Sequence, residues 1–198
     1  MVGSDQSIQK IVLRIFASLK TQPSMNRPSE TKFTRISGLA DYPEIRSLFQ
    51  DIKSMRSFKG GEIWPDDKIR KYLDYFEKEG PRSKYIDWRI SLNNQTVGVV
   101  GIQPTLTWMG NKYKGKLMLS ILINSNFWGK GYGKHGVLMG IQRFQVLFPG
   151  EPLLFALVNT SNFRAHKLMQ SCGFKIDQRL NLKGQDKLVI YKFALVNK

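Results

Sequence analysis

This chain of 198 residues has little cysteine, few acidic side chains and no long apolar run. Its single cysteine, Cys172, excludes a disulfide within the chain and is typical of a protein from a reducing compartment. No apolar stretch approaches the roughly 20 residues that a membrane-spanning helix requires. We therefore expect a cytoplasmic protein without a transmembrane segment. Apolar residues make up 41% of the sequence, which suits a single folded domain of this length.

Acidic residues are scarce, because 15 Asp and Glu stand against 31 Lys and Arg, and the formal net charge is +16. Between Asp87 and Glu151 the sequence has no acidic residue at all. The basic residues of that interval are Arg89, Lys112, Lys114, Lys116, Lys130, Lys134 and Arg143. Such a surface indicates a negatively charged partner, which would be an acidic protein or peptide, a nucleic acid or a ribonucleoprotein, unless the charge serves solubility alone. It argues against polyamine substrates, which it would repel.

Residues 1–30 form a separate amphipathic segment and linker ahead of a domain at residues 31–198. Apolar residues recur there at helical spacing, at Ile8, Ile11, Val12, Ile15, Phe16 and Leu19. We expect an extra helix that packs on the domain; alternatively, residues 1–20 direct the protein to an organelle or a membrane surface, because they are basic and nearly free of acidic residues. Whether residues 1–24 belong to the mature protein stays open, since Met25 also offers a start.

Helices and strands alternate from Thr31 onward. The first strand is expected at 32–36, followed by a helix that Asp41 caps and that buries Ile45, Leu48, Phe49 and Ile52. A second helix, capped by Asp66, buries Ile69, Tyr72, Leu73 and Phe76. Two hairpins are expected, one at 85–92 and 96–102 around Asn93-Asn94-Gln95, the other at 175–182 and 188–195.

The central stretch runs from 117 to 148 and reads as strand, glycine loop and helix. An apolar strand at 117–123 precedes Gly129, Gly131 and Gly133, and a helical stripe of Val137, Leu138, Ile141, Phe144 and Phe148 follows. Glycines allow backbone N–H groups to approach a ligand closely, and the unpaired donors of a helix N-terminus attract anions. Lys130 and Lys134 add positive charge. The pattern predicts a phosphate-bearing ligand.

Two common phosphate motifs do not fit this loop. A Walker loop requires Ser or Thr after Gly-Lys, whereas His135 follows Gly133-Lys134. The run from Gly131 to Gly136 matches G-x-G-x-x-G, but the next strand ends in Asn159 and lacks the carboxylate that a dinucleotide fold places there.

A third motif accounts for more of the sequence. Trp128-Gly129-Lys130-Gly131-Tyr132-Gly133 resembles the Q/R-x-x-G-x-G/A signature of the GNAT superfamily of acetyl-CoA-dependent N-acetyltransferases. The run from Val158 to Ala165, together with Cys172-Gly173-Phe174, resembles the second signature of that family, in which an asparagine precedes the last helix and Gly-Phe closes it. The sequence is most similar to the subgroup that contains the ribosomal-protein N-terminal acetyltransferases. The resemblance covers residues 31–195.

This resemblance implies an α/β (α+β) GNAT fold, with a mixed, mostly antiparallel sheet of six to seven strands and about four helices. It implies direct transfer of the acetyl group of acetyl-CoA to a primary amine in a ternary complex, without a metal. The residues that it places on acetyl-CoA are Ile121, Leu122 and Ile123 on the central strand, Gly129, Lys130, Gly131, Tyr132, Gly133 and Lys134 around the pyrophosphate, and Asn162 on the pantetheine arm.

The positions that carry acid–base residues in the family are occupied otherwise here. Leu157 stands where many members have a glutamate, Met169 where many have a tyrosine, and Ala165 where the subgroup has a serine. The catalytic residues therefore stay unassigned; a base from the front of the domain, Glu62 or Asp66, is one alternative. The two histidines, His135 and His166, are expected to be ordinary surface residues.

Two classes of function follow. The first is an active N-acetyltransferase that acts on a small amine, an amino-acid derivative or a protein N-terminus. The second is a catalytically degenerate GNAT-fold module whose basic surface binds a nucleic acid or an acidic partner. The intact glycine loop favours the first class, and the missing acid–base residues favour the second. The acceptor is not specified by the sequence, and either a monomer or a homodimer is expected.

Overall fold

A computed structural model describes residues 30–56, 58, 61–80, 85–181 and 187–195. They form a seven-stranded sheet with the strand order β1-β2-β3-β4-β5-β7-β6. The strands are β1 (Lys32–Arg35), β2 (Ile86–Leu92), β3 (Gln95–Pro104), β4 (Leu117–Ile123), β5 (Leu153–Asn159), β6 (Lys175–Leu180) and β7 (Leu188–Ala194). Neighbouring strands are antiparallel except β4 and β5, which are parallel. The predicted mixed, mostly antiparallel sheet is confirmed; the predicted helix at the N-terminus lies outside the described residues.

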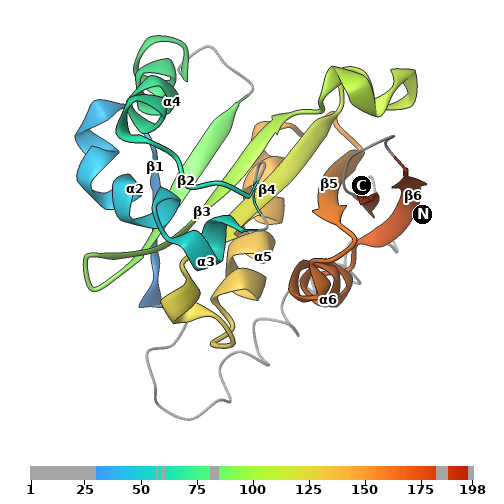
Figure 1. Ribbon diagram of the computed structural model, residues 1–198. Helices are drawn as coiled ribbons and strands as arrows, with labels where there is room; N and C mark the ends of the chain where they lie inside the picture. Colours follow the sequence, from blue (N-terminus) through green and yellow to red (C-terminus); the bar gives the residue numbers. More distant parts are fainter. Residues whose placement is uncertain (1–29, 57, 59–60, 81–84, 182–186, 196–198) are drawn as a thin grey trace.

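Helices cover both faces of the sheet (Figure 1). One face carries α5 (Tyr132–Leu147) and α6 (Phe163–Ser171), and the other carries α2 (Tyr42–Phe49), α3 (Ile52–Met55) and α4 (Asp66–Lys78). The described part thus has five α-helices where about four were expected, because α3 is a single short turn that the sequence pattern did not reveal. Within the described ranges, no helix is both long enough and apolar enough to cross a membrane.

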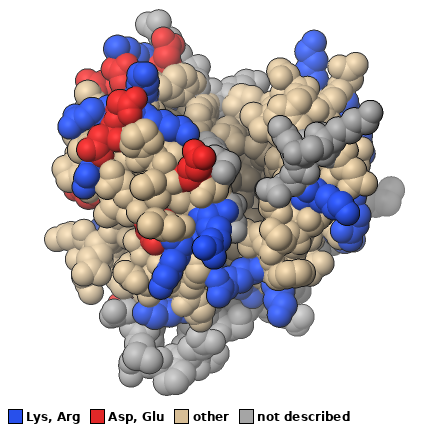
Figure 2. Space-filling view, in the orientation of Figure 1, with Lys and Arg blue, Asp and Glu red and all other residues tan. Residues whose placement is uncertain are grey.

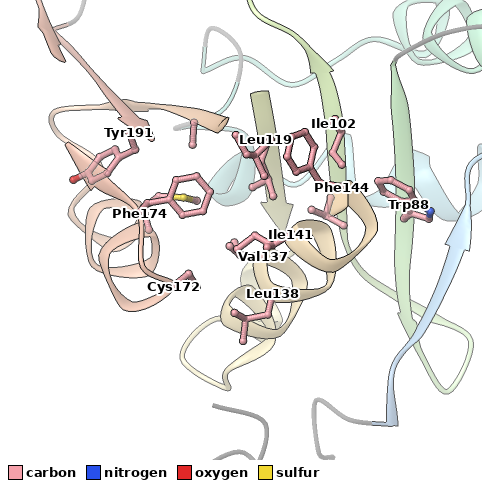
Figure 3. Close-up of a cluster of buried hydrophobic side chains, with 14 of the residues drawn as sticks. Trp88, Ile102, Leu119, Val137, Leu138, Ile141, Phe144, Cys172, Phe174 and Tyr191 are labelled. Carbon is pink, nitrogen blue, oxygen red and sulfur yellow. The ribbon is translucent and has the colours of Figure 1, made fainter. Parts of the chain in front are cut away.

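The larger core lies between α5 and the sheet (Figure 3). Val137, Ile141 and Phe144 on α5 pack against apolar strand residues such as Ile102 and Leu119, and all five are at most 3% exposed. Burial of each such side chain contributes about 1.5–3 kcal/mol. The helical stripe predicted for the central stretch is therefore the face that fixes α5, and with it the glycine loop, against β4.

A second core holds α2 and α4 on the opposite face. Phe49 stacks on Trp64 with ring centroids 4.4 Å apart, and Leu48 and Leu73 are fully buried. The prediction that Ile52 joins this buried face was wrong, because α2 ends at Phe49 and Ile52 begins α3 with 66% of its surface exposed.

The predicted turn between β2 and β3 is confirmed, whereas the two predicted helix caps are not formed as expected. The hairpin between β2 and β3 is confirmed, and its turn uses positive φ angles at Asn93 (47°) and Asn94 (63°), which asparagine tolerates. Asp41 does occupy the N-cap of α2, but its carboxylate accepts a hydrogen bond from Ser37 N instead of capping the helix. Asp66 is the first residue of α4 and pairs with Arg46 at 2.9 Å, so the cap predicted there was wrong.

Candidate functional site

The sheet splits between its two parallel strands. β4 and β5 are paired only at Leu117–Leu154 and Met118–Phe155, near the start of each strand. On its other side β4 stays paired with β3 as far as Ile123. The last residues of β4 therefore have a sheet neighbour on one side only, and the other side opens into a cleft.

The pairing register decides which backbone groups face this cleft. Asn124 N–H donates to Val97 O at 2.8 Å, and hydrogen-bonded pairs alternate along an antiparallel ladder. The alternation turns the backbone groups of Leu122 toward β3 and those of Ile121 and Ile123 toward the split. The carbonyl of Ile123 already accepts hydrogen bonds from Ser54 Oγ (3.0 Å) and Trp128 Nε1 (2.8 Å). The N–H and C=O of Ile121 and the N–H of Ile123 are the groups left facing the cleft.

A cavity of about 570 Å³ occupies the split. Its walls come from α3 and Phe58 on one side, β4 and the glycine loop in the middle, and α6 on the other. The lining residues are Lys53, Ser54, Phe58, Ile121, Leu122, Ile123, Phe127, Trp128, Gly129, Gly131, Gly133, Lys134, Asn162, Arg164, Ala165, Lys167, Leu168 and Ser171.

Two of the ten residues expected at the coenzyme do not line this cavity. Lys130 is exposed, and its Nζ donates to the carbonyl of Asn126 at 3.0 Å. Tyr132 is 1% exposed, and its ring packs edge-on against Phe127 with centroids 5.6 Å apart. The structure brings the other eight together, although the backbone of Leu122 points away toward β3.

The glycines of the loop serve two different needs. Gly129 and Gly131 have φ angles of 75° and 84°, in the left-handed region that favours glycine, and Gly131 is the N-cap of α5. Gly133 instead provides space, since a Cβ there would lie 3.3 Å from Leu168 Cδ2 on α6. The first turn of α5 consequently presents its unpaired N–H groups and its positive dipole end to the cavity.

The cavity is basic. Lys53, Lys134, Arg164 and Lys167 line it, and none of the described lining residues is acidic. Figure 2 shows Lys and Arg gathered along the lower rim of the hollow between the two halves of the molecule. Most Asp and Glu of this view lie instead over α2 and α4. Such a field attracts a polyanion into the cavity.

The sequence reasoning missed Lys53, Arg164 and Lys167 as lining residues. A signal existed for the last two, because they lie three residues apart on the helix that follows Asn162 and so share a helix face. Lys53 belongs to α3, whose position depends on Asp51. The Asp51 carboxylate accepts hydrogen bonds from Lys53 N, Ser54 Oγ and Ser125 N, and so joins α3 to the loop before α5.

Asp51 is consequently held in its charged form. Burial by itself would raise the pKa of this carboxyl, but the hydrogen bonds from Ser54 and Ser125 outweigh it and bring the pKa below the ordinary value. The ionised carboxylate acts as a fixed clamp between α3 and the loop.

Asn162 is the N-cap of α6, and its Oδ1 accepts a hydrogen bond from Ala165 N at 3.1 Å. The amide nitrogen of this side chain and the second lone pair of its Oδ1 are the groups that would make the expected contact with a pantetheine arm. The cap explains part of the preference for asparagine here, because an N-cap oxygen contributes about 1 kcal/mol to helix stability.

The two histidines, and the residues at the positions where the family has acid–base side chains, differ in their burial. The prediction that His135 is a surface residue was wrong: it is 6% exposed against Phe33, and burial lowers its pKa. His166 is half-buried, with Nδ1 2.7 Å from Tyr191 Oη and Nε2 3.0 Å from the carbonyl of Asn159. Met169 is 3% exposed in the main core, and Leu157 is half-buried on β5.

The two carboxylates that the sequence offered as an alternative base lie outside the cavity. Glu62 and Asp66 are exposed and do not line the cavity, and Asp66 pairs with Arg46 and Gln50. Among the described residues, no group of three or more His, Cys, Asp or Glu side chains is arranged to hold a metal ion.

Comparison with known proteins gives a family and a fold. A family model for the acetyltransferase (GNAT) domain matches residues 34–175. No curated protein sequence matches the chain. Among solved structures, the ribosomal-protein-alanine N-acetyltransferase of Brucella melitensis is similar, with a TM-score of 0.66 and 18% identity over 83% of this chain and 99% of that chain.

Two further solved structures were obtained with coenzymes. The microcin C7 self-immunity acetyltransferase MccE, in complex with acetyl-CoA and AMP, gives a TM-score of 0.67 and 16% identity over 84% of this chain and 93% of that chain. RimL, the ribosomal L7/L12 alpha-N-protein acetyltransferase, in complex with coenzyme A, gives a TM-score of 0.68 and 11% identity over 84% of this chain and 95% of that chain. At these identities the likeness concerns the fold.

Proposed function

Because this chain belongs to the GNAT acetyltransferase family, we propose that it transfers the acetyl group of acetyl-CoA to a primary amine. The observation that carries the proposal is the split between β4 and β5, whose open edge meets the glycine loop and the N-terminus of α5 in one basic cavity. Similar folds solved with acetyl-CoA or coenzyme A support it. The acceptor is a small amine, an amino-acid derivative or a protein N-terminus.

The cavity suits each part of acetyl-CoA. The backbone N–H groups from Gly129 to Lys134 and the N-terminus of α5 would hold the pyrophosphate. The side chains of Lys53, Lys134, Arg164 and Lys167 would balance the phosphate charges. Pantetheine carries amide groups, and the carbonyl of Ile121, which faces the split, would accept a hydrogen bond from one of them.

Acetyl-CoA supplies an acetyl group already activated as a thioester, so the protein has to position it and polarise its carbonyl. The N–H groups of Ile121 and Ile123 are suited to this, because they are fixed by the β3–β4 ladder before any ligand arrives. A pre-positioned donor of this kind is typically worth about 10²–10³-fold in rate. An acceptor amine that enters between α3 and α6 would reach the same place, and proximity itself accelerates acyl transfer.

The test of the proposed function is a screen of acetyl-CoA turnover against a panel of primary amines and N-terminal peptides, with free thiol as the readout. We expect at least one acceptor to raise thiol release well above the rate without amine. Binding of acetyl-CoA without any acceptor-dependent thiol release would contradict transferase activity.

Binding of acetyl-CoA without acceptor-dependent thiol release would support a second candidate function, a GNAT-fold binding module with a basic surface. Leu157, Ala165 and Met169 favour it, since none of these side chains can exchange a proton at the positions where the family does so. In that case acetyl-CoA would serve as a structural or regulatory ligand, and a nucleic acid or another acidic partner would bind the surface. We also propose that the protein is cytoplasmic and that it is a monomer or a homodimer.

A further inference from the structure

A second cavity lies next to the one in the split of the sheet. Its volume is about 450 Å³, which falls within the range of about 300–1,000 Å³ that is usual for small-molecule sites. Its walls come from the first half of α2, the turn between β2 and β3, and the loop before α5. Of the described lining residues, only Phe127 belongs to both cavities. The two cavities are therefore neighbouring but distinct.

The second cavity differs from the first in its charge. Its lining side chains are polar except for Pro43 and Phe127, and Glu44 is the only charged one among those described. No lysine or arginine of the described ranges lines it, whereas four such residues line the cavity in the split. Phosphate and other anions are consequently poor ligands for the second cavity. Its walls favour a ligand that is rich in hydrogen-bonding groups instead.

Residues with side-chain amides form much of the wall. They are Asn94, Gln95, Asn124 and Asn126. Within the described part of the chain, the side-chain amides of Asn94, Gln95 and Asn126 make no hydrogen bond, and Asn124 uses only its Oδ1, which accepts from Asn126 N at 3.0 Å. An amide group offers both donors and an acceptor. The wall can thus pair with ligand groups that also donate and accept, as hydroxyl groups do.

Two buried oxygen atoms of the lining residues have no hydrogen-bond partner among the described residues. They are Oε2 of Glu44 and Oγ1 of Thr96. The other carboxylate oxygen of Glu44 lies 3.2 Å from Arg89 Nη1, and Thr96 is 9% exposed. Buried polar atoms are nearly always hydrogen-bonded in folded proteins. These two oxygens therefore indicate a partner that comes from outside the chain.

The available groups narrow the chemical class of this partner. The carboxylate of Glu44 can turn toward a ligand hydroxyl, because the last torsion of a glutamate side chain is broad. Since Arg89 already balances the charge of Glu44, the cavity does not select an ammonium group. Pro43 and Phe127 offer an apolar surface to the C–H groups of a carbon skeleton.

We propose that the second cavity binds a neutral polyhydroxylated compound, either a monosaccharide or a cyclic polyol. Its hydroxyl groups donate to Glu44 and pair with Thr96 and with the side-chain amides of the wall. Closely spaced hydroxyls on a compact ring match a wall in which nearly every side chain is polar. This binding does not require acetyl transfer.

Thr96 provides the sharpest test. Thr96→Val keeps the shape of the side chain but removes the hydroxyl, and removal of an unpaired buried hydroxyl does not destabilise a fold. Thr105→Val is the matched control, because the Thr105 hydroxyl donates to the carbonyl of Tyr113 and this residue does not line the second cavity. Gln95→Ala, at an exposed position of the wall, keeps the test open if Thr96→Val does not fold.

The measurements are saturation-transfer NMR of the full chain with glucose, galactose, ribose and myo-inositol, an NMR titration of the best binder, and urea unfolding. We expect wild type to bind at least one of these compounds. Thr96→Val and Gln95→Ala should bind it about two- to tenfold more weakly, which is the usual worth of one hydrogen bond, and Thr105→Val should bind it as wild type does. Thr96→Val should be at least as stable as wild type, whereas Thr105→Val should be less stable.

Three results would overturn the proposed polyol site. If none of the four compounds binds wild type, the cavity does not serve this class of ligand. If one of them binds wild type, Thr96→Val and Gln95→Ala with equal affinity, it binds elsewhere on the protein. A loss of stability in Thr96→Val as large as that in Thr105→Val would mean that the Thr96 hydroxyl is paired within the protein. None of these results bears on acetyl transfer, which the amine panel tests separately.

Discussion

The guanidinium of Arg164 lies 4.5 Å from the centre of the Trp128 ring. Arg164 belongs to α6, and Trp128 belongs to the loop before α5, so this contact joins the two sides of the split in the sheet. Trp128 is held in turn by the hydrogen bond from its Nε1 to the carbonyl of Ile123. The pair therefore fixes a cationic group at the wall of the cavity, next to the backbone of β4.

We expect Arg164→Ala to weaken acetyl-CoA binding about tenfold, which corresponds to the loss of one charged contact with phosphate. Arg164→Lys should retain part of the affinity, because it keeps the charge but loses the planar stack. Calorimetric titration at low and high salt would measure both effects. Lys175→Ala, which removes an exposed charge on β6, is the control, and an equal loss in that variant would mean that only the net charge matters.

Asp177 should make stability depend on acid pH. Burial would raise its pKa, but hydrogen bonds from Lys112, Lys192 and Tyr113 lower the pKa of this carboxyl to about 2. Because the folded value lies below an unfolded value of about 3.9, the carboxylate stabilises the fold by about 2 kcal/mol above that pH. This contribution is lost as the pH falls from about 4 toward 2.

The check is urea unfolding of wild type and Asp177→Asn between pH 6 and pH 2. The variant should be less stable at pH 6, and the difference should narrow as the solution becomes acidic. A difference that is the same at every pH would show that the charge of Asp177 is not the source of the stability.

His166 should be structural. Both of its ring nitrogens are hydrogen-bonded, to Tyr191 Oη at 2.7 Å and to the carbonyl of Asn159 at 3.0 Å, and Tyr191 is 1% exposed. We expect His166→Ala to lower the free energy of unfolding by about 1–3 kcal/mol, because the buried Tyr191 hydroxyl and the partly buried Asn159 carbonyl lose their partner. Single-turnover acetyl transfer should stay within about twofold of wild type, since loss of a general acid would cost about 10²–10⁴-fold. A rate loss beyond about tenfold with intact acetyl-CoA binding would make His166 the proton donor instead.

Local chemistry made much of the fold predictable. The turn at Asn93 and Asn94 follows from the tolerance of asparagine for positive φ, and the order of strand, glycine loop and helix follows from glycine spacing and the apolar stripe of α5. These features depend on residues close together in the sequence.

What could not be predicted depends on residues far apart in the chain. Which residues of β2, β3 and β4 lie opposite one another, such as Asp87, Gly101 and Ser120, depends on the registers of two strand pairs, which no local pattern specifies. The point at which β4 and β5 separate also depends on strand pairing, because β5 pairs with β4 at two positions only. His135 was expected at the surface because its helical neighbours gave no sign that β1 would place Phe33 against it.

The central claim is that the glycine loop binds acetyl-CoA, and the most direct measurement is calorimetric titration of acetyl-CoA into wild type, Gly131→Val and Gly150→Val. Gly131 has a φ of 84° and caps α5, so valine there is strained and blocks the approach of the backbone to the pyrophosphate. Gly150 has open space around its missing Cβ, which makes it the matched control. We predict binding to wild type and Gly150→Val and none to Gly131→Val. Equal affinity in all three proteins, or no binding to wild type, would contradict the account.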